Sequence, residues 1–409
     1  MKILSIETSC DETGISILEV KGNTFKILGN VLNSQIKIHA PFGGVFPALA
    51  KREHIKNLPI LLEKILKQTK TRTSPEKKIK KNLTPNPSPY QGEGQIEDNV
   101  TAPDIDLIAV TSGPGLEPAL WTGIVFAKEL SKKWNIPIVP VNHMEGHLFS
   151  VFVKNKEFSI EKINFPALSL LVSGGHTELV LIKDFGKYQI IGETLDDAAG
   201  EAFDKVARML ELPYPGGHYV SKLAEEARRN LSPLLFKEGV GGGNLKDHHL
   251  ALKGTPPQQG GEQIHLPRPM IYSKNFNFSF SGLKTAVLYL IRDLKKENPK
   301  ILENENVKKA IALEFENAVV ETLIYKTRKA IEKYNIKTLI VAGGVSANKY
   351  LKKEAQKLTK NKQKLYFPTK KLSGDNALMI GIAGYYKFIK NKQKTTRFSK
   401  IKALGGLRL

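Results

Sequence analysis

Cysteine is almost absent from this chain. Cys10 is the only cysteine in 409 residues, so no intrachain disulfide can form, and a reducing cytoplasmic setting is expected. Long apolar runs are also missing, which argues against a membrane span. The opening residues, MKILSIE, turn polar too early for a signal peptide. No G-x-x-x-x-G-K-[ST] motif occurs, which excludes a P-loop protein.

Acidic residues are far outnumbered by basic ones. The 40 Asp and Glu residues face 62 Lys and Arg residues, which gives a formal net charge of +22. Such an excess attracts polyanions, and nucleic acid is the first partner to consider. The alternative is that these lysines are solvated and have no partner. The length favours two domains, and a hydrophobic content of 41% allows a core of ordinary size.

The segment HMEGH at 143–147 carries two histidines four residues apart. On a helix, His143 and His147 project from one face and can hold one metal ion. The spacing is that of the H-E-x-x-H zinc-protease motif, but Met144 stands where that motif has its general base, and Glu145 lies about 100° further round the helix. The pair therefore indicates a metal site and argues against peptide hydrolysis. Two solvated or capping histidines are the alternative.

The hydrophobic pattern predicts two halves of similar layout, in which strands meet at polar, glycine-containing turns. In the first half, we expect strands at 2–7, 14–20, 25–35, 106–111 and 136–141, and helices at 48–67 and 117–134. In the second, we expect strands at 167–172, 178–182, 188–192 and 338–342, and helices at 199–211, 281–295, 305–334 and 375–390. This layout predicts a duplicated α/β fold with a central cleft.

Two stretches differ from this scaffold, one at about 70–102 and one at about 230–262. Both contain Asn-Leu-Thr/Ser-Pro followed by Glu-Gly, and both are rich in proline and glycine without apolar periodicity. This composition is typical of disordered surface loops. We expect two copies of one inserted element, with no catalytic role. The alternative, a basic arm for nucleic acid, concerns only the lysines at 77–81.

Three glycine-containing or polar turns follow predicted strands, at 8–13, 173–177 and 343–348. Their backbone N–H groups can approach a phosphate, so together they favour a nucleotide in the cleft. Acids also cluster. Asp11 and Glu12 lie in the first turn, and the acids at 197, 201 and 204 share a helical face that is either functional or simply solvated. Asp375 is either a helix N-cap or a third, oxygen ligand beside the two histidines.

Seven motifs in register resemble the universal Kae/TsaD family over nearly the whole chain outside the two insertions. They are IETSCDETG (6–14), HMEGH (143–147), LVSGGHTEL (171–179), DDAAGEAFDK (196–205), YPGG (214–217), FSFSGLKT (278–285) and AGGVSAN (342–348). Asn142 departs from many relatives, which have another histidine there. The resemblance implies the duplicated actin-like, sugar-kinase-like (ASKHA, RNase H-like) fold. The corresponding domains are 1–141 with about 382–409, and 142–381.

The resemblance implies a tRNA N6-adenosine threonylcarbamoyltransferase. Its donor is threonylcarbamoyl-AMP, its acceptor is the adenosine next to the anticodon (adenosine 37) of tRNAs reading codons that begin with A, and AMP leaves. The implied metal ligands are His143, His147 and Asp375. The implied substrate-binding residues are Leu171, Val172, Ser173, Gly174, Gly175, Asp204, Gly217 and Asn348. One divalent metal per subunit is expected, with Fe²⁺ preferred to Zn²⁺, although this ligand set suits either.

The same resemblance implies work with an inactive paralogue, TsaB, and a small ATPase, TsaE. Asp11 and Glu12 are candidates for proton removal from the attacking adenine amine, because their turn is directed at the expected cleft. Two other functions stay open at this point. A metalloprotease is suggested by the two histidines, and an ATP-hydrolysing kinase or chaperone of the same fold is suggested by the glycine turns.

Overall fold

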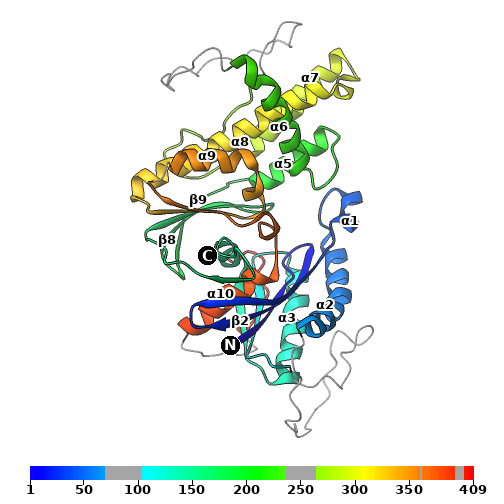
Figure 1. Cartoon of the computed structure of the whole chain (residues 1–409). Coiled ribbons are helices and arrows are strands. Elements are labelled where there is room, and N and C mark those ends of the chain that lie inside the picture. Colours follow the sequence, from blue (N-terminus) through cyan, green and yellow to red (C-terminus); the bar gives the residue numbers. More distant parts are fainter. Residues whose placement is uncertain (70–102, 236–263, 360–361, 392–399) are drawn as a thin grey trace.

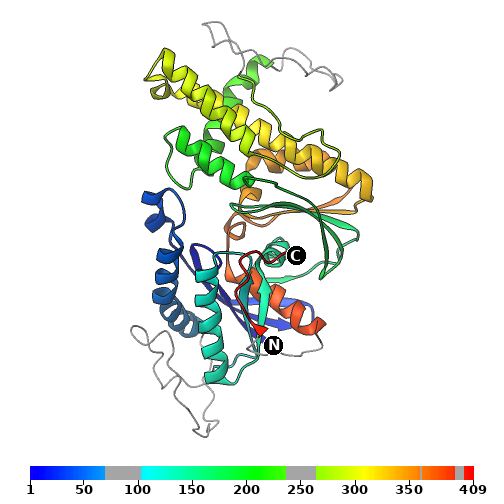
Figure 2. The ribbon, with the colours of Figure 1, turned by 180° about the vertical axis from the view of Figure 1, so that it is seen from behind.

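The computed structural model describes residues 1–69, 103–235, 264–359, 362–391 and 400–409. The chain folds into two halves, each built on one β-sheet, and helices separate the sheets and cover their outer faces (Figures 1 and 2). The predicted loop at 70–102 and most of the one at 230–262 lie outside the described residues.

The first sheet has strand order β5-β4-β1-β2-β3-β6. Strands β1, β4 and β5 are parallel, whereas β2, β3 and β6 are joined by antiparallel pairing. The bounds are β1 Lys2–Glu7, β2 Glu12–Lys21, β3 Thr24–Ser34, β4 Leu107–Gly113, β5 Ile138–Asn142 and β6 Glu157–Ser159.

The second sheet repeats this arrangement with the order β11-β10-β7-β8-β9. Its bounds are β7 Ala167–Val172, β8 Thr177–Asp184, β9 Lys187–Glu193, β10 Thr338–Ala342 and β11 Lys364–Tyr366. Strands β7, β10 and β11 are parallel, and β8 and β9 are antiparallel additions, so the strands correspond one to one with β1 to β5. This correspondence confirms the predicted duplicated α/β fold.

Helices form three layers around the two sheets. Helices α2 (Pro47–Thr69) and α3 (Glu117–Trp134) cover the outer face of the first sheet. The second sheet is covered by α5 (Ala199–Met209), α6 (Gly217–Leu235), α7 (Ser281–Glu297), α8 (Glu305–Tyr334) and α9 (Lys349–Thr359). Helices α4 (His143–Ser150) and α10 (Ala377–Lys390) lie between the sheets and contact each other. The short helix α1 (Ile36–His39) lies at the edge of the first half.

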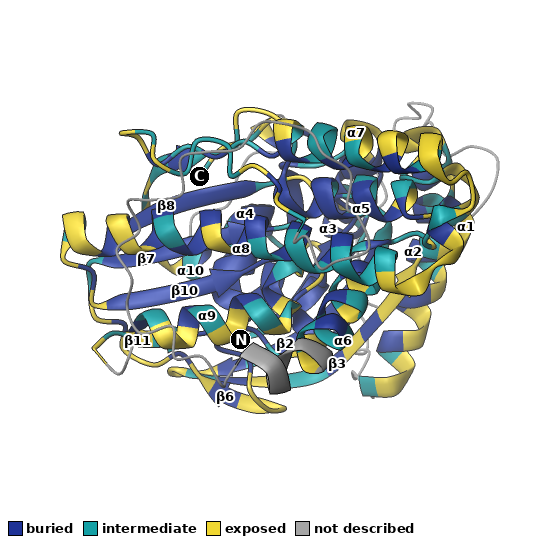
Figure 3. Ribbon diagram, turned by 90° about the horizontal axis from the view of Figure 1, so that it is seen from above, coloured by how far each residue is buried: buried dark blue, intermediate teal, exposed yellow. Residues whose placement is uncertain are grey.

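The central strands are buried on both faces because each sheet has helices on both sides, as Figure 3 shows. In β1, Leu4 and Ile6 pack towards α2 and α3, whereas Ile3 belongs to the cluster around α4 and α10. This explains why β1 is a continuous apolar run and not an alternating one. The cluster around α4 and α10 also contains Leu171 of β7 and Ile340 of β10, so the two halves share this middle layer.

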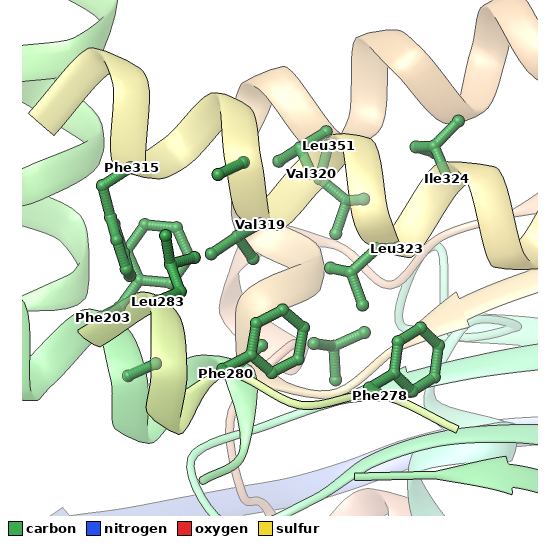
Figure 4. Packing of buried hydrophobic residues seen from close by; sticks show 14 of the residues in the cluster. Phe203, Phe278, Phe280, Leu283, Phe315, Val319, Val320, Leu323, Ile324 and Leu351 are labelled. Atoms are coloured by element: carbon green, nitrogen blue, oxygen red, sulfur yellow. The ribbon is translucent and has the colours of Figure 1, made fainter. Parts of the chain in front are cut away.

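The core of the second half is rich in phenylalanine. Phe203 of α5 meets Phe315 of α8 edge to face, with ring centroids 5.1 Å apart, and Phe278 and Phe280 lie beneath α8 (Figure 4). All four are buried. The two phenylalanines of the FSFSG motif therefore have a packing role, since they fill the space between α8 and the sheet.

Several elements differ from the expectations. Helix α6 was not predicted, and it continues to Leu235, so the second insertion was placed too early. Strands β6 and β11 have only three residues each and were missed. Helix α9 was not among the helix ranges expected above, and a 3₁₀ turn at Gly344–Ala347 precedes it. Strand β6 pairs with β3, and α10 packs on the first sheet. The domain boundaries given above stay a prediction.

No helix in the described part of the chain is long and apolar enough to cross a bilayer.

Lys326 of α8 is buried in the second half without a carboxylate partner among the described residues. Its Nζ donates to Ser273 Oγ at 2.6 Å and to the carbonyl of Asn275 at 2.8 Å. Burial lowers the pKa of Lys326 to about 8, because the charged form loses its hydration.

Lys326→Met should therefore remove one component of the pH dependence of stability. Between about pH 8 and 10.5 the unfolded chain holds more protons on this amine than the folded one, so its contribution to the free energy of unfolding rises with pH. Urea unfolding at about pH 7 and about pH 9.5 measures this rise. Lys329→Met, at an exposed ion pair with Glu332, is the control and should retain it. An equal rise in wild type and Lys326→Met would contradict the assignment.

Candidate metal centre and nucleotide site

Three side chains converge where α4 and α10 begin. The Nε2 atoms of His143 and His147 lie 3.2 and 3.3 Å from Asp375 Oδ1, and the three potential ligand atoms all lie within 4.8 Å of one another. Ligands about 2.0–2.1 Å from one tetrahedral ion are separated by ~3.3 Å, so the spacing suits a shared cation. The structure brings together the three residues predicted as metal ligands.

Two asparagines set the helix starts that position these ligands. The Asn142 side chain accepts hydrogen bonds from the N–H groups of Met144 and Glu145 and so caps α4. The Asn376 side chain accepts from the N–H of Met379 and caps α10. The N-cap alternative for Asp375 was therefore wrong by one residue, which leaves its carboxylate available to the histidines.

Glu7, at the end of β1, orients His143 from the opposite side. Its Oε2 lies 3.1 Å from His143 Nδ1, and it also accepts from Thr111 Oγ1 and the Ser9 N–H, each at 2.6 Å. A carboxylate on Nδ1 fixes the tautomer that presents Nε2 to a metal. Glu7 was not predicted as a site residue, although an acid at the end of an apolar strand was a usable signal.

The charged groups of this cluster shift one another's pKa values. Burial alone would lower the pKa of His143, but the carboxylates of Asp375 and Glu7 outweigh it and hold the pKa well above its usual value. Burial would likewise raise the pKa of Asp375, yet His143 and His147 keep that pKa well below its ordinary range. The charged forms of His143, Glu7 and Asp375 therefore stabilise one another.

The ring nitrogens of His147 lack hydrogen-bond partners in the described part of the chain, which also fits a divalent metal at this site. His147 is fully buried, and neither of its ring nitrogens has a hydrogen-bond partner of good geometry among the described residues. A buried imidazole without partners is costly, and a bound cation at Nε2 would satisfy it. Two histidines and one carboxylate are a ligand set that iron and zinc both use.

Glu145 points away from this centre. Its Oε1 accepts a hydrogen bond from Tyr188 of β9 at 2.7 Å, and burial raises the pKa of Glu145. The glutamate that could have served as a protease base is therefore engaged elsewhere. This agrees with the interpretation that its displaced position argues against peptide hydrolysis.

The glycine turns of the second half meet at one end of β7. A Cβ on Gly343, which has φ +88°, would lie 2.5 Å from the carbonyl oxygen of Val172, and one on Gly200 would lie 2.5 Å from that of Ser173. Only glycine allows these approaches. Gly174 and Gly175 instead have no atom within 4 Å of an added Cβ, so their backbone borders open space. The turn after Val172 therefore packs closely against Gly200 and Gly343, whereas its Gly174 and Gly175 border open space.

His176 closes this turn and was missed in the sequence analysis. Its N–H donates to Ser173 Oγ, and its carbonyl accepts from the Ser173 N–H. Burial, together with the nearby His143 and His147, lowers the pKa of His176 to about 4. His176, at the end of this turn, therefore lies close enough to His143 and His147 for their charges to affect its pKa.

Asp204 and Asn348 lie on separate elements of the second half. Asp204 Oδ1 accepts from the N–H groups of Gly216 and Gly217 at 2.7 and 3.0 Å, and burial raises its pKa. Asn348 donates from Nδ2 to Ser221 Oγ and Glu316 Oε1 and caps α9 through Oδ1. Asp204 thus shapes the YPGG turn, and the Asn348 amide already has protein partners. Their substrate contacts stay a prediction.

The acids near α5 are not a solvated face. Asp197 pairs with Lys205 and Lys284 at 2.7 and 3.2 Å. The neighbouring Asp196, whose role the sequence did not reveal, accepts hydrogen bonds from Ser279, Phe280 and Ser281 of the FSFSG motif. These hydrogen bonds join the DDAAGEAFDK and FSFSGLKT motifs, which are far apart in the chain, at the start of α7.

Asp11 lies in the turn after β1 as predicted, whereas Glu12 is the first residue of β2. Burial, followed by the charges of Asp11 and Asp375, raises the pKa of Glu12 well above its usual value. Burial is the main cause of the raised pKa of Tyr214 in the YPGG turn, and the charges of Asp11, Asp204 and Glu12 raise it further.

The chain is similar in sequence to one protein family along most of its length. The model of TsaD, described as tRNA N6-adenosine threonylcarbamoyltransferase, matches residues 26–79, 95–242 and 241–382. Proteins of that name from Thermosipho africanus and Dictyoglomus turgidum are 40% and 41% identical over 386 and 391 residues. These alignments cover 94% and 95% of this chain and 94% of each relative.

Solved structures resemble the chain more remotely. Full-length HypF in its phosphate- and nucleotide-bound form matches with a TM-score of 0.48 and 12% identity, over 95% of this chain and 46% of HypF. The (R)-2-hydroxyglutaryl-CoA dehydratase component A of Acidaminococcus fermentans matches with a TM-score of 0.43 and 11% identity, over 95% and 98% of the two chains.

Glu7→Gln should weaken metal binding by about 10- to 100-fold, because His143 loses the carboxylate that orients it and raises its basicity. Titration of the purified chain with Zn²⁺ against a competing chelator measures this affinity without any turnover. The amide still fills the site and can accept from Thr111, so thermal unfolding of the metal-free chain checks that the fold persists.

Glu145→Gln is the matched control for this prediction. It lies on α4 between the two histidines, but its carboxylate contacts Tyr188. Its Zn²⁺ affinity should equal that of wild type. Equal losses in both variants would mean that Glu7 acts only through general stability.

Proposed function

The chain belongs to the family of tRNA N6-adenosine threonylcarbamoyltransferases, TsaD, and on this premise we propose how its residues perform the reaction. It is a transferase that modifies N6 of a tRNA adenosine with a threonylcarbamoyl group. In this proposal the donor is threonylcarbamoyl-AMP and the acceptor is adenosine 37, next to the anticodon of tRNAs reading codons that begin with A. AMP is the leaving group.

The proposed transfer breaks one bond and forms another at the carbamoyl carbon. The adenine N6 attacks this carbon, the bond to the phosphate oxygen of AMP breaks, and AMP leaves with the electron pair. N6 loses one proton to a base. Since the mixed anhydride is already activated, positioning and charge stabilisation should supply most of the rate enhancement.

The convergence of His143, His147 and Asp375 is the observation on which the proposed site depends. These residues would hold one divalent cation, and we expect Fe²⁺ in preference to Zn²⁺. When bound, the cation supplies Lewis acidity to the oxygens of the donor. Glu7 keeps the His143 Nε2 directed at the shared position, and the middle helices fix the separation of the ligands.

The open side of the 173–175 turn suits the donor. The backbone of Gly174 and Gly175 can approach a phosphate closely, because no atom lies where their side chains would be. In this proposal Leu171, Val172 and Ser173 supply the rest of that wall. Asp204, Gly217 and Asn348 bind the nucleoside part, with Asn348 exchanging its contact to Ser221 or Glu316 for the ligand.

Asp11 and Glu12 are the proposed proton acceptors. A carboxylate whose pKa is raised by burial accepts a proton more readily near neutral pH, and Glu12 has this property. The Ser34 hydroxyl donates to Glu12 at 3.1 Å and holds it in place.

The substrate that membership implies is tRNA, and the charge of +22 suits a polyanion. We further propose the partners TsaB and TsaE and a cytoplasmic location. A metalloprotease is not favoured, since Glu145 contacts Tyr188 and not the metal centre. An ATP-hydrolysing kinase or chaperone would not require the buried histidine pair.

Reconstitution tests the proposed reaction. The chain, the partner proteins, the donor-forming enzyme, threonine, bicarbonate, ATP and unmodified tRNA are incubated, and the digested nucleosides are analysed by mass spectrometry. Threonylcarbamoyladenosine should form. His143→Ala and Asp375→Ala should each lower its rate by at least about 100-fold, because Lewis-acid stabilisation is worth several kcal/mol.

Glu145→Gln serves as the folded control and should retain the rate, because it keeps a polar contact with Tyr188. Partner proteins shown to be active with another family member exclude a failure of the assay. Absence of product under those conditions, or full activity of the His143 and Asp375 variants, would contradict the proposed site.

Glu12→Gln should lower kcat by roughly 100- to 10,000-fold with little change in KM, if Glu12 removes the proton. In wild type, kcat should fall as the pH drops through the raised pKa of Glu12, because only the carboxylate accepts a proton. Asp11→Asn tests the second candidate. Full turnover in both folded variants would exclude the pair as the base.

A further inference from the structure

The segment between α1 and α2 presents two phenylalanines to solvent. Phe42 and Phe46 are 62% and 55% exposed, and their rings stack on each other with centroids 6.0 Å apart and planes 26° apart. Neither contributes to a hydrophobic core cluster. An exposed aromatic pair of this kind marks a surface that contacts a partner.

The backbone that carries these rings is firmly anchored. The buried His39 accepts the N–H of Phe46 at Nδ1, and its Nε2 lies 3.1 Å from Gln35 Oε1. Gly43 adopts φ +65°, and its carbonyl accepts a hydrogen bond from Arg208 of α5. The aromatic pair is therefore presented by a fixed loop, so little conformational entropy is lost when it is covered.

The same loop forms one wall of a pocket between the two halves. The pocket has a volume of about 450 Å³, and Phe42 and Gly43 line it on one side, whereas Asp204, Arg208 and Tyr214 line it on the other. Figures 1 and 2 both place α1 opposite α5. Tyr214 lines this pocket, and the charges of Asp11 and Glu12 contribute to its raised pKa, as the charge of Asp375 contributes to that of Glu12.

Basic residues flank the aromatic pair in the sequence. Lys37 precedes it on α1, and Lys51, Arg52 and Lys56 follow it along α2. All four are exposed, and within the described ranges none of them forms an ion pair. The centre of a protein–protein interface is typically depleted of charge, whereas aromatics interleaved with cations are typical of surfaces that bind single-stranded nucleic acid.

We propose that Phe42 and Phe46 form a stacking platform for an unpaired base of the tRNA loop beside the target adenosine. This inference rests on the proposed function. For N6 of the adenosine to reach the donor, its base must leave the loop stack, and its neighbours lose a stacking partner at that moment. The platform replaces that partner at the mouth of the pocket, and the cations of α1 and α2 contact the adjoining phosphates.

The test uses the full chain with the proteins that support turnover, and an unmodified anticodon stem-loop with 2-aminopurine next to the target adenosine. Binding by wild type should quench the 2-aminopurine fluorescence, because the probe stacks. Phe42→Ala/Phe46→Ala should remove the quenching and weaken binding by about 5- to 100-fold, the range for one lost stacked base. Phe42→Trp should keep both, whereas Phe42→Leu, which is apolar without a π face, should not.

The salt dependence of binding separates stacking from charge. The aromatic variants should leave the slope of log affinity against log salt unchanged, whereas Lys51→Gln/Arg52→Gln should make it shallower. Tyr289→Ala, an aromatic of α7 that is 51% exposed, is the matched control and should behave as wild type.

Wild-type binding and quenching that persist in the double alanine variant would overturn the platform and leave the proposed function intact. Loss of association with the partner proteins on gel filtration, with stem-loop binding unchanged, would overturn it in favour of a protein-docking surface. Failure of wild type itself to bind the stem-loop would overturn both the platform and the proposed function.

Discussion

The structure depends on one buried cluster of opposite charges between the two sheets. Glu7 ends the first strand, His143 and His147 begin α4, and Asp375 precedes α10, so the cluster joins segments from almost the full length of the chain. Burying a carboxylate alone would be costly, but Glu7 and Asp375 both lie against His143. Two internal helices, each capped by an asparagine, keep the partners at ligand distance.

The duplicated sheets give this cluster its surroundings. Corresponding ends of β1 and β7 are followed by turns, and those turns lie on either side of the middle helices. The first turn carries acids, and the second carries glycines with open space before them. The repeated scaffold thus carries two chemically different turns, one acidic and the other rich in glycine.

Much of this arrangement was predictable from the sequence, and the remainder for the most part depends on contacts between distant residues. Long periodic helices such as Glu305–Tyr334 and the apolar strands matched their predicted ranges closely, and the family resemblance implied the trio of potential metal ligands that the structure brings together. The strands β6 and β11 were too short to produce a pattern. Glu7 and Asp196 act through partners more than 80 residues away, which no local pattern encodes.

The position of α10 also bears on how the chain folds during synthesis. This helix covers one face of the first sheet and packs against β1 and β2, yet it is made after almost everything else. The earliest strands therefore keep an apolar face uncovered until residues 377–390 leave the ribosome. Nascent chains of this protein should be ready clients for chaperones, since exposed sheet faces of this kind promote aggregation.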